Sequence, residues 1–344
     1  MNKNRRVIAL GFFDGVHNGH GALLRRVVDK ARELDATPAA FTFDPHPQTV
    51  ILGRPMPLLT SPEDRADLMR KYYGIQEVIV ASFDAMQRMD WHDFVARYLV
   101  EELGVVHVVA GHDFHFGYMG KGNPRRLQEK CAQLGIGCDI IPKVEQDGIT
   151  ISSTYIRTLV AQGEIERANE FLGHPYTLSD RVSHGKKLGS TLGFPTVNLR
   201  LKENVLSPAK GVYATKVILE NGETHPAVTN VGTRPTVNNG TDVTVEAACW
   251  TSRGICTAPR CAWSFSTNCG MRCALTPWMP CASRSPPTQR PPGPTSGITL
   301  TGLWNNNRTN EEAACGSLLF CCFQPYTSHT VSHTRPMPAA PMRV

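Results

Sequence analysis

Short apolar runs alternate with stretches of helical periodicity over the first half of this 344-residue chain. Four runs predict buried β-strands: VIALGFF (7–13), PAAFTF (38–43), EVIVASF (77–83) and VVHVVAG (105–111). Helices are predicted between them over 22–34, from Pro62 onward behind a capping pair of Ser61 and Asp64, and over 91–103. This alternation predicts an α/β fold in which a Rossmann-like parallel sheet carries helices on both faces.

The pattern changes after a boundary at Gly173–Pro175. Three β-rich runs separated by Gly, Pro and Asn follow: GVYATKVIL (211–219), HPAVTNVG (225–232) and DVTVEA (242–247). Such a series predicts a small antiparallel barrel or sandwich. We therefore divide the chain into a first domain over 1–173, a second over 176–246 and a tail over 247–344.

Composition sets that tail apart from the rest of the chain. The formal net charge is +6, but the tail holds eight Arg, no Lys and two Glu, so the first 246 residues are electrically balanced. Nine of the eleven Cys also lie in the tail. The balanced body argues against a nucleic-acid partner, and the absence of a long apolar run argues against a membrane span. We expect a cytoplasmic protein, because few thiols lie in the body.

The stretch GFFDGVHNGH (11–20) places two imidazoles between a strand and a helix start. Backbone N–H groups at such a helix start attract anions, and Gly15 and Gly19 allow a phosphate to approach the backbone. His17 and His20 can then donate hydrogen bonds to a phosphate whose charge grows during group transfer. Taken alone, the pair is more simply interpreted as one surface histidine and one helix cap.

Further motifs follow in order along the chain. GFFDGVHNGH and ISSTYIR (151–157) resemble the two signatures of the HxGH nucleotidyltransferase superfamily, and FTFDPHP (41–47) and GHDFHFGYMGKG (111–122) resemble segments of its flavin-specific branch. HGKKLGSTLGFPTVNLRL (184–201), GVYA (211–214) and NVGTRPT (230–236) resemble a riboflavin kinase module. Over residues 5–246 the chain thus resembles bacterial bifunctional riboflavin kinase/FMN adenylyltransferases.

For the first domain the resemblance implies transfer of AMP from ATP to FMN, giving FAD and pyrophosphate. His17, His20 and Arg157 would be catalytic. The phosphates of ATP would be held by Gly15, Gly19, Ser153 and Thr154. The flavin would be bound by Asp44, His46, Asp113 and Phe114. Mg²⁺ is expected as a cofactor, because it neutralises phosphate oxygens.

For the second domain the resemblance implies phosphorylation of riboflavin by ATP. Glu246 would be the general base that takes the proton of the ribityl hydroxyl. Thr196 and Asn198 would ligate Mg²⁺ from one face of an extended segment. A loop containing Gly185, Gly189 and Gly193 would wrap the phosphates of ATP. Without the resemblance, Glu246 is simply a carboxylate at the end of a strand.

The resemblance stops at Ala247, where the family continues with LLDF and then LYG. Shifting the reading frame of ACWTSRGICTA by two bases forces Leu and then Asp from Cys249 to Thr251, and it permits an LYG reading from Ile255 onward. We therefore hypothesise a frameshift near Ala247 and a largely disordered, out-of-frame tail. The barrel would then be incomplete and the kinase activity impaired.

Three alternatives remain open at this point. The first domain could be another HxGH nucleotidyltransferase with a different substrate. The chain could also be a flavin- or nucleotide-binding protein without catalytic activity. Finally, the basic tail could be a genuine appendage that binds nucleic acid. The sequence leaves the oligomeric state open.

Overall fold

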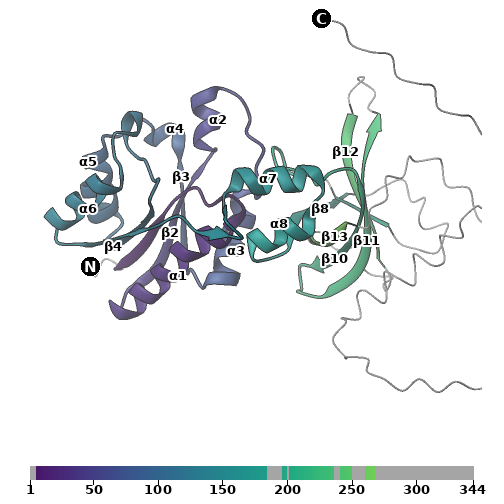
Figure 1. Ribbon diagram of the computed structural model, residues 1–344, viewed down its shortest axis with the longest axis horizontal. Helices are drawn as coiled ribbons and strands as arrows, with labels where there is room; N and C mark the ends of the chain where they lie inside the picture. Colours follow the sequence, from purple (N-terminus) through teal and green to yellow (C-terminus); the bar gives the residue numbers. More distant parts are fainter. Residues whose placement is uncertain (1–4, 184–195, 200, 236–240, 250–259, 269–344) are drawn as a thin grey trace, which may run out of the picture. The chain divides into compact units, whose positions relative to one another are not determined.

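The computed structural model describes residues 5–183, 196–199, 201–235, 241–249 and 260–268 (Figure 1). All of them fall within one compact unit, Met1–Met279. No helix in this part of the chain has the length and apolar character that crossing a membrane requires.

The first domain is built on a five-stranded parallel sheet with the strand order β3-β2-β1-β4-β5. Its strands are β1 (Arg6–Leu10), β2 (Thr37–Asp44), β3 (Glu77–Ser82), β4 (Val105–Gly111) and β5 (Gly137–Ile141). The four predicted strands and the parallel α/β arrangement are confirmed, and β5 is a strand that we did not predict. In this order the connections diverge on either side of β1, which puts a ligand-binding crevice at the carboxyl end of that strand.

Helices cover both faces of the sheet. The α-helices of the described chain are α1 (Asn18–Glu33), α2 (Pro47–Leu52), α3 (Pro62–Tyr73), α4 (Phe83–Met86), α5 (Trp91–Asp93), α6 (Pro124–Gln133), α7 (Ser153–Gln162) and α8 (Ile165–Leu172), of which α7 and α8 pack against the second domain. The chain also forms two 3-10 turns, η1 (Asp14–Val16) and η3 (Tyr118–Gly120), and a π-helix η2 (Phe94–Glu102), which with α5 fills the helix predicted over 91–103. A short hairpin of β6 (Glu145–Gln146) and β7 (Ile149–Thr150) precedes α7.

Alternation along β1 explains why the sheet needs two covering layers. Ile8 and Leu10 pack into the cluster that includes η2 and α6, whereas Val7 and Ala9 pack into the cluster that includes α1 and α3. All four side chains are essentially inaccessible to solvent. A strand that is apolar on both faces is typical of a central position in a parallel sheet.

The predicted start of α3 is confirmed. Ser61 Oγ accepts a hydrogen bond of 3.2 Å from the backbone N–H of Asp64, and Pro62 occupies the first helical position. The Ser61 hydroxyl also donates to the Asp64 carboxylate at 2.7 Å. This cap fixes where the chain enters α3, next to the loop that contacts the turn after β1.

The second domain is an antiparallel barrel with the order β10-β11-β12-β9-β8-β13. Its strands are β8 (Tyr176–Ser183), β9 (Thr196–Leu199), β10 (Gly211–Leu219), β11 (Thr224–Pro235), β12 (Thr241–Cys249) and β13 (Arg260–Asn268). The predicted antiparallel barrel agrees with this arrangement, in which β8 follows the end of α8 at Leu172.

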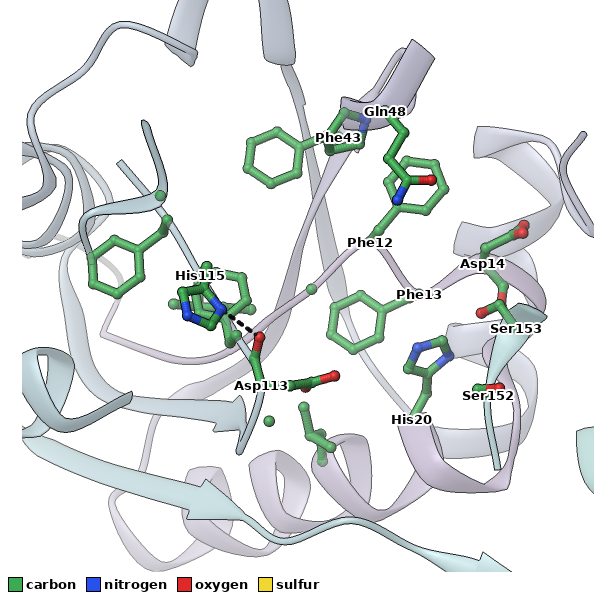
Figure 2. A pocket seen from close by; sticks show the side chains of 18 of the residues that line it. Phe12, Phe13, Asp14, His20, Phe43, Gln48, Asp113, His115, Ser152 and Ser153 are labelled. Atoms are coloured by element: carbon green, nitrogen blue, oxygen red, sulfur yellow. Dashed lines mark hydrogen bonds between the residues drawn. The ribbon is translucent and has the colours of Figure 1, made fainter. Parts of the chain in front are cut away.

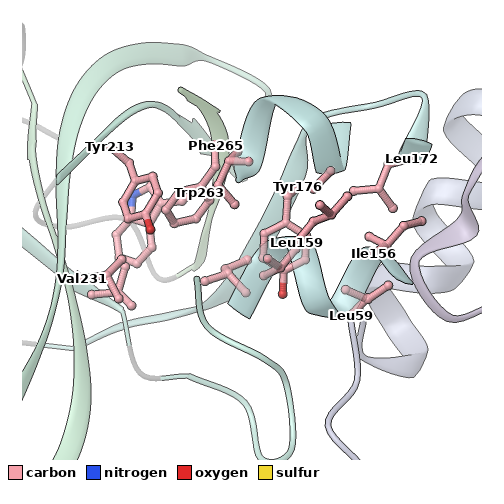
Figure 3. Packing of buried hydrophobic residues seen from close by; sticks show 14 of the residues in the cluster. Leu59, Ile156, Leu159, Leu172, Tyr176, Tyr213, Val231, Trp263 and Phe265 are labelled. Carbon is pink, nitrogen blue, oxygen red and sulfur yellow. The ribbon is translucent and has the colours of Figure 1, made fainter. Parts of the chain in front are cut away.

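The structure corrects one expectation about the barrel. We expected it to lack closing partners after Ala247, but β13 pairs with both β10 and β8 and the ring of strands is closed. The physical reason is a local alternation, since Cys261, Trp263 and Phe265 are buried in the core cluster of the barrel. Figure 3 shows Trp263 and Phe265 in this cluster. The remaining tail residues, 250–259 and 269–344, for which we predicted disorder, lie outside the described residues.

Candidate active site

The candidate active site begins with a strained turn directly after β1. Phe13 and Val16 have positive φ angles of 60° and 45°, and Gly15 between them has a φ of 78°. A β-branched residue such as valine rarely adopts this conformation, and each such residue costs on the order of 1–3 kcal/mol. Such a turn persists only where its surroundings hold it in place.

A buried carboxylate holds the centre of this turn. Asp14 is 1% exposed and accepts hydrogen bonds from the backbone N–H groups of Leu59 at 2.9 Å and Thr60 at 3.0 Å. Its second oxygen receives the Arg157 guanidinium at 2.7 Å from Nη2 and 3.2 Å from Nε. The Asp14 carbonyl also accepts a hydrogen bond of 2.9 Å from the Ser153 hydroxyl. Asp14 therefore joins the turn to the start of α7.

The flanks of the turn are fixed by a second set of contacts. The Gly15 N–H donates to Thr60 Oγ1 at 3.1 Å, and its carbonyl lies 3.0 Å from His174 Nε2. Asn18 Nδ2 donates to the carbonyl of Glu170 at 3.0 Å. Any side chain at position 15 would meet Leu59 at 2.7 Å, so this position requires glycine for space as well as for its φ angle. The turn thus rests on the loop before α3, on α7 and on α8.

His17 and His20 form a stacked pair at the start of α1. Their ring centroids lie 3.6 Å apart at an interplanar angle of 13°. His17 caps the helix, because its Nδ1 accepts a hydrogen bond of 3.2 Å from the backbone N–H of His20. Burial, with the nearby Arg157 charge, lowers the pKa of His17 to about 3, and burial holds the pKa of His20 well below its usual value. Both rings are therefore neutral at neutral pH.

The tautomer of His17 follows from its cap. Since Nδ1 accepts a hydrogen bond, the proton of the neutral ring must sit on Nε2, which leaves this atom as a donor. His20 differs, because its buried Nδ1 has no hydrogen-bond partner among the residues that the structure describes. A Cβ atom at Gly19 would lie 3.1 Å from the His17 ring, so the small residue between the histidines permits their stacking.

These groups line a cavity of about 940 Å³ at the carboxyl ends of the strands (Figure 2). Of the predicted site residues, the cavity brings together His17, Gly19, His20, His46, Asp113, Phe114, Ser153, Thr154 and Arg157. Gly15, within the turn, is buried and does not line the cavity, and Asp44 is exposed and does not line it either. The volume lies at the upper end of the range for small-molecule sites, which suits a reaction between two ligands.

His46 also lines the cavity. It caps α2, since its Nδ1 accepts a hydrogen bond of 3.0 Å from the backbone N–H of Gln48. Burial, together with the nearby charges of Arg157 and Arg65, lowers the pKa of His46 to about 4. His46 therefore also presents a neutral ring with its proton on Nε2.

Aromatic side chains form the deeper wall of the cavity. Phe114 and Phe116 stack with centroids 5.5 Å apart, and Phe94 lies 5.4 Å from Phe116. Phe43 and Phe83 meet edge to face at 5.4 Å. All five line the cavity, which thus joins an aromatic compartment to the polar end at His17 and Arg157. Such a site suits a ligand with a flat ring system and a phosphate.

Sequence reasoning missed several residues that shape this site. Asp14 and Thr60 hold the turn and Arg157, and Arg65 contacts Phe12 from outside the cavity. The contacting pairs are separated by 46, 53 and 143 residues, so no local pattern reveals them. The only sequence signal was the position of Asp14 inside the motif itself.

In the barrel, Glu246 on β12 stands directly opposite Asn198 on β9. Their neighbours Val245 and Leu199 point into the core, so Glu246 and Asn198 share the other face. Thr196 lies two residues before Asn198 on the same strand. The predicted glycine loop with Gly185, Gly189 and Gly193 lies outside the described residues.

Comparison with known proteins agrees with this division into two domains. The profile of the FAD synthetase family matches residues 1–155, and that of the riboflavin kinase family matches residues 172–255. A crystal structure described as a macrolide-efflux protein from Streptococcus pneumoniae superposes with a TM-score of 0.68 and 27% identity, covering 78% of this chain and 87% of that one.

Curated relatives carry both activities in one chain. The bifunctional riboflavin kinase/FMN adenylyltransferase of Listeria monocytogenes is 40% identical over 244 residues, which is 70% of this chain and 76% of the relative. That of Bacillus subtilis is 38% identical over 67% of this chain and 73% of its own, and that of Escherichia coli K12 is 35% identical over 67% and 74%. The chain therefore belongs to the family of bifunctional riboflavin kinase/FMN adenylyltransferases, enzymes of flavin cofactor biosynthesis that act on ATP, FMN and riboflavin.

Proposed function

We propose that the cavity after β1 is the site of AMP transfer from ATP to FMN. An oxygen of the FMN phosphate attacks the α-phosphorus of ATP while the bond from that phosphorus to the bridging oxygen breaks, giving FAD and pyrophosphate. The observation that carries this proposal is the convergence of His17, His20 and Arg157 on one cavity, where the buried Nδ1 of His20 has no partner among the described residues. A buried polar atom of this kind gains most from a ligand.

The neutral imidazoles act as hydrogen-bond donors in this mechanism. His17 donates from Nε2 to an oxygen of the α-phosphate, where negative charge increases during the transfer. Because the burial of these rings keeps them neutral, they stabilise charge without releasing a proton to the leaving group. His20, stacked on His17, fixes the plane of that ring.

The leaving pyrophosphate is held at the start of α7. Ser153, Thr154 and Arg157 line the cavity there. The guanidinium uses Nε and Nη2 for Asp14, and its Nη1 remains for phosphate oxygens. Asp14 is therefore a positioning residue that aims Arg157.

The flavin occupies the aromatic compartment in this proposal. Phe114 supplies an apolar surface for the ring system, and Asp113 lies beside it on the cavity wall. His46 donates from Nε2 toward the phosphate end of FMN. Asp44 is exposed outside the cavity, so its contribution is to the loop that carries His46.

Magnesium fits the oxygen-rich face of the barrel. Asn198 and Glu246 stand opposite each other, and amide, carboxylate and hydroxyl oxygens are ligands that Mg²⁺ accepts. We propose that Thr196 and Asn198 hold the ion with the phosphates of ATP and that Glu246 accepts the proton of the riboflavin hydroxyl. The ion, when bound, neutralises phosphate charge. In the first cavity, the phosphates of ATP would supply most of its ligands.

The frameshift hypothesis bears on the second activity. Similarity to the riboflavin kinase family stops at residue 255 of 344, which supports our proposal that the kinase half is impaired. Closure of the barrel by β13 removes the simplest cause, an open sheet edge. The remaining cause of impaired kinase activity is a change in the residues after 255, which would otherwise contribute to the ligand-binding site of the barrel.

A split assay tests both halves. The purified chain receives Mg-ATP with either FMN or riboflavin, and the flavin products are separated by chromatography. We expect FAD from FMN, a strong loss of that activity in Arg157→Met, and little product from riboflavin. The exposed Arg32→Met serves as the matched control. FMN formation from riboflavin at the rate of FAD synthesis would refute the impairment, and absence of FAD would leave a binding protein or a different nucleotidyltransferase.

A further inference from the structure

Arg65 is a buried cation that forms no ion pair with a carboxylate among the described residues, although the charges of Asp14, Asp44 and Glu63 lie near enough to favour its charged form. The side chain sits in the first turn of α3 and is 0% exposed. Its Nε and Nη2 are buried and have no hydrogen-bond partner among the described residues. Burial lowers its pKa to about 10, so it remains charged at neutral pH. A buried, incompletely paired charge is costly, and its position near a helix N-terminus adds to that cost.

Apart from a longer hydrogen bond of 3.3 Å from Nη1 to the carbonyl of Phe43, the contacts of Arg65 converge on Phe12, a residue of the cavity wall. Nη1 donates to the carbonyl of Phe12 at 2.9 Å and to Thr42 Oγ1 at 2.7 Å, and the Thr42 hydroxyl donates to the same Phe12 carbonyl at 2.8 Å. The guanidinium carbon also lies 3.9 Å from the centroid of the Phe12 ring. Arg65 therefore fixes both the backbone and the ring of Phe12.

Phe12 in turn contacts His46, so a fixed Phe12 ring also limits the orientation of the His46 ring. The two rings meet edge to face with centroids 4.2 Å apart, and both line the cavity, whereas Arg65 does not. Phe12 is also the residue before the strained turn, and its ring is seen at the cavity wall near Phe13 and Gln48 (Figure 2). Arg65 therefore does not face a ligand in the cavity and can influence it only through the residues of the wall.

We propose that Arg65 is a positioning residue for adenylyl transfer, which holds Phe12 and through it the His46 imidazole in the orientation that binds the phosphate end of FMN. This inference rests on the proposed role of His46 at the flavin side of the cavity. It explains why the fold keeps a charge at a place where an apolar side chain of similar size would cost less. The cation also places positive charge behind a site for an anionic substrate.

The test compares Arg65→Met with Arg65→Lys and with the control Arg70→Met, which changes an exposed arginine of the same helix. For Arg65→Met we expect the KM for FMN to rise about tenfold, as for loss of one supporting contact, while the KM for ATP and kcat change less than about twofold. The melting temperature should stay the same or rise, because a buried charge is removed. Arg65→Lys should fall between the two, and Arg70→Met should match the unaltered chain.

Measuring Arg65→Met in a chain that also carries His46→Gln separates a positioning role of Arg65 from a general loosening of the fold. In His46→Gln, the effect of Arg65→Met on the KM for FMN should shrink below about twofold, because the imidazole that Arg65 positions is already absent. An undiminished effect there, an equal rise in both KM values, or an unchanged KM for FMN would overturn the proposal. If Arg65→Met does not fold, Phe12→Leu must raise the KM for FMN in the same way, and an unchanged value would refute it. Failure of the proposed function is recognised separately, because the unaltered chain would then make no FAD from FMN.

Discussion

Replacing Asp14 by asparagine removes one negative charge from the turn after β1 and leaves the shape of the side chain almost unchanged. The amide oxygen of asparagine can still accept the backbone N–H groups of Leu59 and Thr60. Its NH₂ group, however, would face the N–H donors of Arg157, which now reach a carboxylate oxygen at 2.7 Å. The substitution therefore turns a charge-assisted pair into a contact between donors.

The expected cost follows from burial. Removing one partner of a buried ion pair costs about 3–5 kcal/mol. Asp14 is 1% exposed but the Arg157 side chain is 14% exposed, so the freed guanidinium regains some hydration. We therefore expect Asp14→Asn to lower the free energy of unfolding by about 3 kcal/mol, the lower end of that range. Asp67→Asn removes an exposed partner of Arg70 and should cost less than about 1 kcal/mol.

Urea unfolding and FAD synthesis from FMN measure the two consequences together. Asp14→Asn should lose adenylyl transfer under conditions where it is still folded, because Arg157 is no longer aimed at the phosphates. The double variant Asp14→Asn/Arg157→Met should be more stable than Asp14→Asn, since it no longer buries an unpaired charge. A loss of stability no larger than that of Asp67→Asn, with normal FAD synthesis, would refute this reasoning.

Three further predictions concern the histidine pair and the barrel. The pKa of His17 is lowered from 6.5 to about 3 in the folded chain. Between these pH values His17 is protonated in the unfolded chain but not in the folded chain, so the free energy of unfolding should fall as the pH falls. His17→Asn keeps a capping acceptor and should make that decline shallower in urea titrations from pH 7 to pH 4, whereas an unchanged slope would contradict it. Trp263→Ala should lower barrel stability by about 3–5 kcal/mol in the same assay, and equal stability to the exposed Val243→Ala would show that β13 does not close the barrel. Glu246→Gln should abolish any residual riboflavin phosphorylation while FAD synthesis from FMN stays unchanged, and equal losses in both would exclude a role confined to the barrel.

Local chemistry allowed much of the fold to be predicted. The apolar runs at β1 to β4 and the cap at Ser61 depend on neighbouring residues only, so they can be read from the sequence. The motif at His17 and His20 likewise marks the start of a helix, which the structure confirms. Periodicity and caps are local properties, so they can be recognised without knowledge of the tertiary structure.

The supporting contacts could not be predicted in this way. Asp14 meets Thr60 and Arg157 across 46 and 143 residues, and Arg65 meets Phe12 across 53. Strand β13 was missed for a different reason, because a short alternation of Cys, Trp and Phe was hidden in a segment whose overall composition indicated disorder. In both cases the partner, rather than the residue itself, determines the role.

The strained turn after β1 has a consequence for the order of events during synthesis. Its partners Ser153, Arg157 and His174 follow it by 139 to 159 residues, so they leave the ribosome long after β1. A nascent chain that ends at β5 can pair its parallel strands and form the hydrogen bonds of Asp14 with Leu59 and Thr60. It still lacks the contacts from α7 and His174 that complete the support of the positive φ angles of Phe13 and Val16. We expect the turn to be relaxed in such intermediates and to adopt its final conformation only when α7 and α8 pack against it. The active site would therefore form late in folding.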